Sequence, residues 1–193
     1  MKRLFGVFAL ALVAALMLTG CGSDADNAGS GSSASAQFND ADVKFAQSMI
    51  PHHEQAVMMA KMARSQASSA EVKDLAAKIE AAQGPEITTM SGWLKAWGED
   101  VPSGSDMGGM DHGSDGMDGM MSDDDMMSLD SSTGTGFDQM FLTMMIKHHE
   151  GAIEMAQTEL DQGANEEVIA LAQAILDTQT TEIATMENLL TQN

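Results

Sequence analysis

Apolar positions recur at helical spacing along most of the chain beyond residue 38. Between residues 45 and 60 they follow the three- and four-residue steps of one helical face. A second stripe of this kind consists of Val72, Leu75, Ala76, Ile79, Ile87, Met90 and Leu94. No segment alternates with a period of two, so the pattern predicts an all-α protein without a sheet.

The whole pattern repeats after a shift of 96 residues, which aligns residue 45 with residue 141. FAQSMIPHHEQAVMMA (45–60) then falls on FLTMMIKHHEGAIEMA (141–156), and EVKDLAAKIEAAQGPEITTM (71–90) falls on EVIALAQAILDTQTTEIATM (167–186). Because the identities are spread along both helices of the unit, we interpret the chain as a tandem duplication. Two helical hairpins with short turns predict an antiparallel four-helix bundle.

The two hairpins are expected at residues 39–97 and 136–193. Between them, residues 98–135 are dominated by Gly, Ser, Asp and Met and are expected to form a linker. Within this linker, the run SDDDMMSL that starts at Ser122 predicts one short helix with a serine cap.

The linker also carries methionines that a flexible acidic segment does not need. This set is Met107, Met110, Met117, Met120 and Met121, with His112 among them. Two interpretations stay open: an arm that sequesters Cu(I) or Ag(I) through thioethers, and a loop whose methionines pack on the bundle. Core or boundary positions are expected for the helical Met58, Met62, Met140 and Met144.

A basic start and a short apolar run make residues 1–20 a signal peptide in this interpretation. The apolar run is too short for a bilayer span, which needs about 20 residues. It ends in LTGC (18–21), which resembles the lipobox of bacterial lipoproteins, so Cys21 is expected to be lipidated. Residues 21–38 are rich in Gly, Ser and Ala and predict a flexible tether that holds the domain outside the cell membrane.

The formal net charge of −20 argues against nucleic acid as a partner and favours cations. Metal ions and, through the lipid on Cys21, the membrane are therefore the expected partners. The sequence leaves open whether the hairpins close within one chain or are exchanged in a homodimer.

Polar residues interrupt the apolar stripes at equivalent places in both units. His52 and His53 straddle the apolar face of one helix, and Glu86 interrupts the stripe of its partner. The candidate metal ligands are His52, His53, Met49, Glu86 and Met90, with their equivalents His148, His149, Met145, Glu182 and Met186. Hairpin geometry sets His52 level with Gln83 and Met49 level with Glu86. Two-fold packing would gather both sets in one bundle interior, where such proteins build metal sites.

A buried imidazole or carboxylate without a partner costs several kcal/mol, and three interpretations meet that cost. In the first, His and Glu bond each other and only specify the packing. In the second, the site binds copper, since imidazole with thioether suits Cu(I) and tolerates Cu(II). In the third, a dinuclear iron or manganese centre uses oxygen, although its usual Glu-x-x-His motif is missing from the chain.

The motifs contain no nucleophile–base pair, no nucleotide-binding loop and no free thiol, so an enzyme is not expected. A metal-free helical module that recruits a partner to the cell envelope is a further alternative to metal binding.

The paired units MIPHHEQAVMMA and MIKHHEGAIEMA, their EI-x-x-M endings and the run GMMSDDDMM before FDQMFL resemble the bacterial family called domain of unknown function 305. The resemblance spans residues 39–193. It implies an exported, ferritin-like four-helix protein, and it associates the paired histidines and the preceding Met49 and Met145 with periplasmic copper binding. The expectation is a membrane-anchored protein that sequesters copper, with silver as a further cargo.

Overall fold

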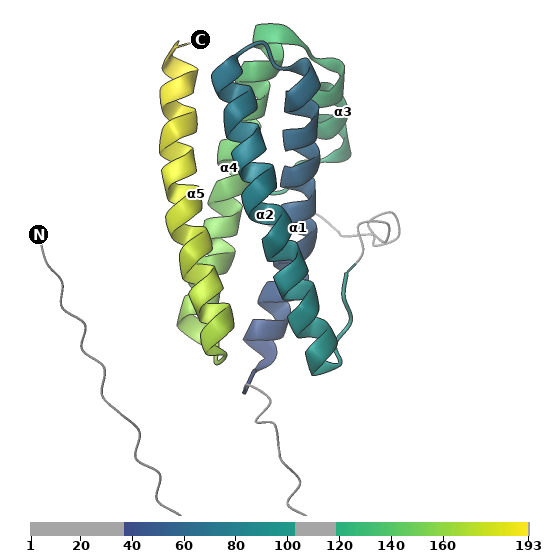
Figure 1. The fold of residues 1–193 in the computed structure, drawn as a ribbon, viewed down its shortest axis with the longest axis vertical. Helices are drawn as coiled ribbons and strands as arrows, with labels where there is room; N and C mark the ends of the chain where they lie inside the picture. The colour runs from purple at the N-terminus through teal and green to yellow at the C-terminus, as the bar shows by residue number, and fades with distance from the viewer. Residues whose placement is uncertain (1–36, 103–118, 193) are drawn as a thin grey trace, which may run out of the picture. The chain divides into compact units, whose positions relative to one another are not determined.

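The computed structural model describes residues 37–102 and 119–192. The described residues form five helices and no strand, apart from an isolated β-bridge between Ala67 and Gly134. The helices are α1 (Asp40–Gln66), α2 (Ala70–Trp97), α3 (Asp123–Ser131), α4 (Gly134–Gln162) and α5 (Glu166–Gln192) (Figure 1). The prediction of an all-α protein is confirmed. The predicted signal peptide (residues 1–20) and the predicted lipidation site Cys21 lie outside the described residues.

Polar side chains begin the helices where the sequence provides them. Asn39 and Asp42 form a reciprocal capping box at the start of α1, and Ser69 caps α2 by accepting from the backbone of Val72. Ser122 caps α3 in the same way, which confirms the short helix expected in the linker. Each cap is worth about 1 kcal/mol, and together they fix where the turns end.

The helices are arranged as two antiparallel hairpins. α1 packs against α2 and α4 packs against α5, while α1 and α4 form the main contact between the hairpins (Figure 1). The short α3 lies beside α1, at the end of the bundle that contains the α1–α2 turn (Figure 1). Among the described helices, none is long and apolar enough to cross a membrane.

The apolar core consists of two clusters that the duplication relates to each other. One cluster contains Phe141, Met145, Ala56 and Ile79, and the other contains their equivalents Phe45, Met49, Ala152 and Ile175. An approximate two-fold axis between the hairpins explains this exchange. Along α1, one cluster uses the residues before His52 and the other uses the residues after His53, so the histidines lie where the clusters meet.

Each hairpin turn is held by a buried aspartate from the other hairpin. Asp138 of α4 accepts a hydrogen bond from the backbone N–H of Ser69 at 3.0 Å, and Asp42 of α1 accepts one from Asn165 at 2.9 Å. Both carboxylates are fully buried, so these hydrogen bonds replace the water that their oxygens lose on folding. The two aspartates are equivalent in the duplication and fasten the hairpins to each other at opposite ends.

Glu159 breaks the symmetry of this arrangement. It is buried beside Asp42, whereas the other hairpin has Ala63 at the equivalent place. A Cβ atom at Gly163 would overlap the Glu159 carboxyl group, and the equivalent residue there is Ala67. Burial, followed by the hydrogen bond and repulsion from Asp42, raises the pKa of Glu159 to about 8. Glu159 therefore holds a proton at neutral pH.

This proton makes the stability of the fold depend on pH. In the unfolded chain Glu159 titrates near 4.5, so between that pH and about 8 the folded state holds the extra proton and stability falls as pH rises. In the wild-type protein, the free energy of unfolding should fall by about 1.4 kcal/mol per pH unit in this window, relative to the Glu159→Gln variant. The variant is the control because its amide has no proton to lose and its N–H can still face Asp42. Urea denaturation between pH 5 and pH 8 measures it; parallel pH profiles for both proteins would refute the assignment.

Candidate metal centre

Four fully buried histidines occupy the level where the two apolar clusters meet. His52 and His53 come from α1, and His148 and His149 come from α4. Successive helical residues point about 100° apart, so the two rings of each pair face different directions. One member points to the centre, where the ring centroids of His52 and His148 lie 3.7 Å apart.

The outer member of each pair bonds a glutamate on the neighbouring helix. His53 Nε2 lies 2.8 Å from Oε2 of Glu86, and His149 Nε2 lies 2.7 Å from Oε2 of Glu182. We call His53, His52, His148 and His149 the row. The glutamates are 21% and 14% exposed, so the row ends in a carboxylate on each side of the bundle. A ring N–H that donates to the carboxylate leaves Nδ1 as the lone-pair nitrogen, and ligating histidines are commonly oriented in this way.

Several polar atoms in this layer lack a hydrogen-bond partner. They include Nδ1 of His53 and of His149 and the side-chain oxygens of Gln83 and Gln179. Leaving one such group unsatisfied costs about 1–3 kcal/mol. A ligand that binds these atoms would offset this cost.

His148 remains neutral at pH 7. Burial, followed by repulsion from the neighbouring His52, His149 and His53, holds the pKa of His148 well below its usual value of 6.5. A neutral imidazole is the form that binds metal ions, so no proton has to be displaced from this ring.

Thioethers flank the row from both sides. Met49 and Met90 are buried in one apolar cluster, and Met145 and Met186 are buried in the other. The structure thus gathers the predicted histidines and glutamates in one row, with the predicted methionines in the adjoining core. Hairpin levels placed Met49 opposite Glu86, but the residue that bonds Glu86 is His53.

The donor set fits copper better than a hard cation. Within the described ranges, no group of three or more His, Cys, Asp or Glu residues is arranged to hold a metal ion. Imidazole and thioether are the most numerous donors in and beside the row, and both are ligands that copper accepts. The donor types in and beside the row therefore suit copper.

The end of the linker crosses the bundle beside this row. Gln55 of α1 donates from Nε2 to the carbonyl oxygen of Met121 at 2.9 Å, and the backbone N–H of Met121 donates to Oε1 of Gln55 at 2.8 Å. Residues 119–121, which we call the strap, are thereby fixed to α1. Met121 is buried in the core, and Met120 is half-buried.

The strap also lies directly against α4. A Cβ atom at Gly119 would be 2.8 Å from the carbonyl oxygen of Lys147 and 3.0 Å from that of His148, and Gly119 has a φ of +82°. The equivalent of Gln55 in α4 is Gly151, whose Cα atom also lies within 3.0 Å of that Cβ position. Sequence reasoning missed this role, although the Gln55/Gly151 mismatch between the repeats was a visible signal.

The remaining predicted linker ligands, Met107, Met110, His112 and Met117, lie outside the described residues. The hypothesis of a metal-binding arm stays a prediction for them.

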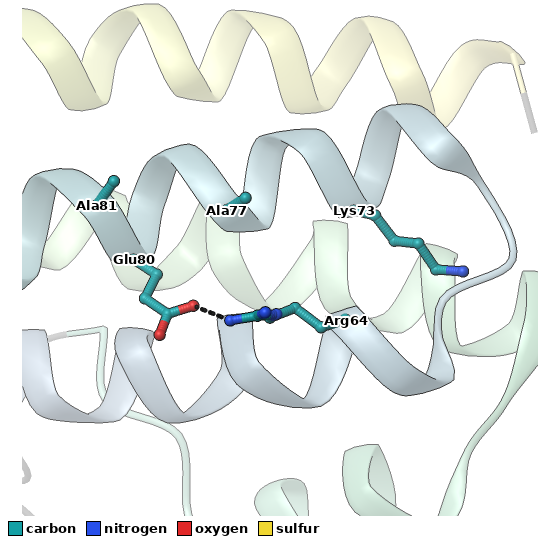
Figure 2. Close-up of a pocket in the computed structure, with 5 residues that line it drawn as sticks. All are labelled: Arg64, Lys73, Ala77, Glu80 and Ala81. Atoms are coloured by element: carbon teal, nitrogen blue, oxygen red, sulfur yellow. Dashed lines mark hydrogen bonds and ion pairs between the residues drawn. The ribbon is translucent and has the colours of Figure 1, made fainter.

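Two surface pockets relate differently to the row. A pocket of about 490 Å³ between α2 and α5 has Glu182 in its wall, so it reaches one end of the row. Figure 2 shows another pocket, lined by Arg64, Lys73, Ala77, Glu80 and Ala81, where Arg64 Nη1 pairs with Glu80 Oε2 at 3.3 Å. This second pocket contains no histidine or methionine, and an exposed ion pair contributes at most about 1 kcal/mol.

A duplicated four-helix bundle with a buried row of paired histidines is the class of protein that these observations define. Over residues 42–190 the chain matches the family model described as Domain of unknown function (DUF305). The chain belongs to this family, which confirms the resemblance seen in the paired motifs.

Solved structures of similar proteins share the fold. A DUF305 fragment from Deinococcus radiodurans has a TM-score of 0.72 at 31% identity, with 81% of this chain and 99% of that chain covered. A DUF305 protein from Streptomyces coelicolor, described as secreted, has a TM-score of 0.70 at 30% identity, with coverages of 79% and 93%.

CopM in its Cu(II)-bound form has a TM-score of 0.68 at 33% identity, with coverages of 78% and 96%. The same protein is also matched in its Cu(I)-bound, silver-bound and apo forms. The comparison with curated proteins gives no match.

Gly119→Ala should lower the free energy of unfolding by about 1–3 kcal/mol, because the positive φ and the contact with α4 both oppose a side chain. Gly92→Ala on the open surface of α2 is the control and should raise stability by about 0.5–1 kcal/mol. Urea denaturation measures both variants. If Gly119→Ala proved as harmless as the control, the strap would not be fixed against α4.

Proposed function

We propose that this chain binds copper, with silver as a second cargo, in the row of four buried histidines. The observation that carries the proposal is the buried Nδ1 atom of His53 and of His149, neither of which has a hydrogen-bond partner. The Glu86 and Glu182 carboxylates support it, since they orient the outer rings so that Nδ1 faces away from the bond.

The similarity to CopM supports copper as the cargo. CopM is matched in Cu(II)-bound, Cu(I)-bound and silver-bound forms, and at 33% identity in the first of these. Buried thioethers beside the imidazoles, as at Met49 and Met145, add the soft donors that Cu(I) and Ag(I) prefer.

We further propose that the protein retains or buffers the ion and does not catalyse a reaction. The histidines are fully buried and the strap crosses beside them, an arrangement that suits retention of a small ion. A site that turns over an organic substrate is instead built as a cleft that can admit it.

A purely structural role is the second candidate, and the two His–Glu hydrogen bonds favour it. These bonds account for one nitrogen in each outer ring. They do not account for Nδ1 of His53 and of His149, which are buried without a hydrogen-bond partner.

Anaerobic titration of the apo protein with Cu(I) against a competing chelator tests the proposal. The double variant His52→Leu/His148→Leu should lower the affinity at least tenfold, which corresponds to about 1.4 kcal/mol. The matched control replaces the linker donors instead, with Met107→Ser, Met110→Ser, His112→Asn and Met117→Ser, and should keep the affinity of the row.

If the affinity fell in the linker variant and stayed unchanged in His52→Leu/His148→Leu, the linker would bind the metal and the row would be structural.

In the unsubstituted protein, imidazole ¹⁵N shifts provide a second measurement that does not depend on how the variants fold. Cu(I) should shift Nδ1 of His53 and His149 more than Nε2, because Nε2 already bonds a glutamate. Iron-dependent oxygen consumption without a Cu(I) response would favour the dinuclear alternative.

We propose that the protein works outside the cytoplasm, held to the membrane by a lipid on Cys21. The lipobox-like LTGC sequence supports this location, as does the similarity to a protein described as secreted. Cells fed a labelled fatty acid should incorporate the label into the wild-type chain and not into Cys21→Ser, which should leave the membrane fraction. Label retained in the variant would contradict the lipid anchor.

A further inference from the structure

A pocket between α1 and α3 is lined by four methionines. Met58 and Met62 come from α1, and Met126 and Met127 come from α3, which lies beside it (Figure 1). The volume of this pocket is about 400 Å³. We call these four residues and the space between them the thioether pocket.

Packing against the core explains part of this set, because Met62 and Met126 are partly buried there, but it does not explain Met58 and Met127. Among the described residues, the large hydrophobic side chains with high exposure are Met58 at 50% and Met127 at 69%, and both line this pocket. The expectation that Met58 lies in the core or at its boundary is therefore wrong. The attachment of α3 to the bundle relies on Leu129, which is fully buried. Exposed apolar surface gains no stability from the hydrophobic effect, so the presence of methionine at these exposed positions has another cause.

The second repeat shows which residues occupy the positions equivalent to Met58 and Met62 on a helix that has no such pocket. The equivalents of Met58 and Met62 are Glu154 and Thr158 of α4, both exposed. A polar residue thus suffices at these positions for a stable helix surface. Methionine replaces it on α1, the helix that α3 adjoins in this pocket.

The charges around the thioethers favour a cation. Glu54, Asp123 and Asp130 line the same pocket, and none of its lining residues is Lys, Arg or His. Carboxylates alone would suit a hard divalent ion. Thioethers are neutral, polarisable donors that select soft ions, and their three rotatable bonds let them close around one.

We propose that Met58, Met62, Met126 and Met127 form a second binding site, for a soft monovalent cation such as Cu(I) or Ag(I). The proposal rests on the proposed function in that it names the same cargo, but it uses a different set of residues. Because Met58 and Met127 are exposed and the histidine row is buried, the pocket exchanges its ion with solvent faster than the row does.

The test uses the full chain labelled with ¹³C in the methionine methyl groups, with Ag(I) as a redox-stable probe. Single Met→Leu variants assign the resonances. Saturable shifts of Met58 and Met127 are expected, while Met140 and Met144, spaced alike on α4 and outside the pocket, should stay unchanged. No shift at Met58 and Met127 would overturn the proposal. An equal shift on adding Mg²⁺ would also overturn it, since a merely acidic patch attracts both ions.

Calorimetric titration of the fourfold Leu variant provides the second measurement. This variant should lose one class of Ag(I) sites while the imidazole ¹⁵N response of the row persists, and the control Met140→Leu/Met144→Leu should keep both. An unchanged number of sites in the fourfold variant would overturn the pocket and leave the row intact. Shifts at Met58 and Met127 without any imidazole response would support the pocket and overturn the proposed function of the row.

Discussion

His52 and His148 meet at the centre of the bundle, with ring centroids 3.7 Å apart and ring planes tilted by 39°. This contact brings α1 and α4 together on the approximate two-fold axis and interrupts the apolar core. Protonation there is opposed by burial and by the neighbouring imidazoles, so the pKa of His148 is held well below its usual value. Each outer histidine instead bonds a glutamate on the neighbouring helix of its own hairpin.

The departures from two-fold symmetry have a common consequence. Gln55 holds the strap where its equivalent Gly151 makes room for it, and Met58 replaces a glutamate where α3 adjoins α1. At the other end, buried Glu159 replaces Ala63 of the first repeat, and Gly163 replaces Ala67 and leaves room for its carboxyl group. The duplication therefore supplies a symmetrical row of donors, and the later differences give the two sides of the bundle different surroundings.

Two kinds of donor are distributed differently over the molecule. The imidazoles are buried and preorganised by hydrogen bonds, which suits strong retention of an ion. Two thioethers of the pocket, Met58 and Met127, are exposed on flexible side chains, which suits rapid capture and release. The carboxylates of Glu86 and Glu182 are intermediate in exposure, since they are partly exposed and hydrogen-bonded to the buried row.

Local patterns in the sequence determined the helices, the short α3, the duplication and the candidate ligands, because helical spacing and polar caps act over a few residues. The family followed from the same paired motifs. The tertiary structure alone decided which histidine of each pair faces the axis, since that depends on how the hairpins are rotated against each other. It also decided that Asp42 and Asp138 fasten opposite turns and that Met58 is exposed, because these features depend on contacts between residues far apart in the chain.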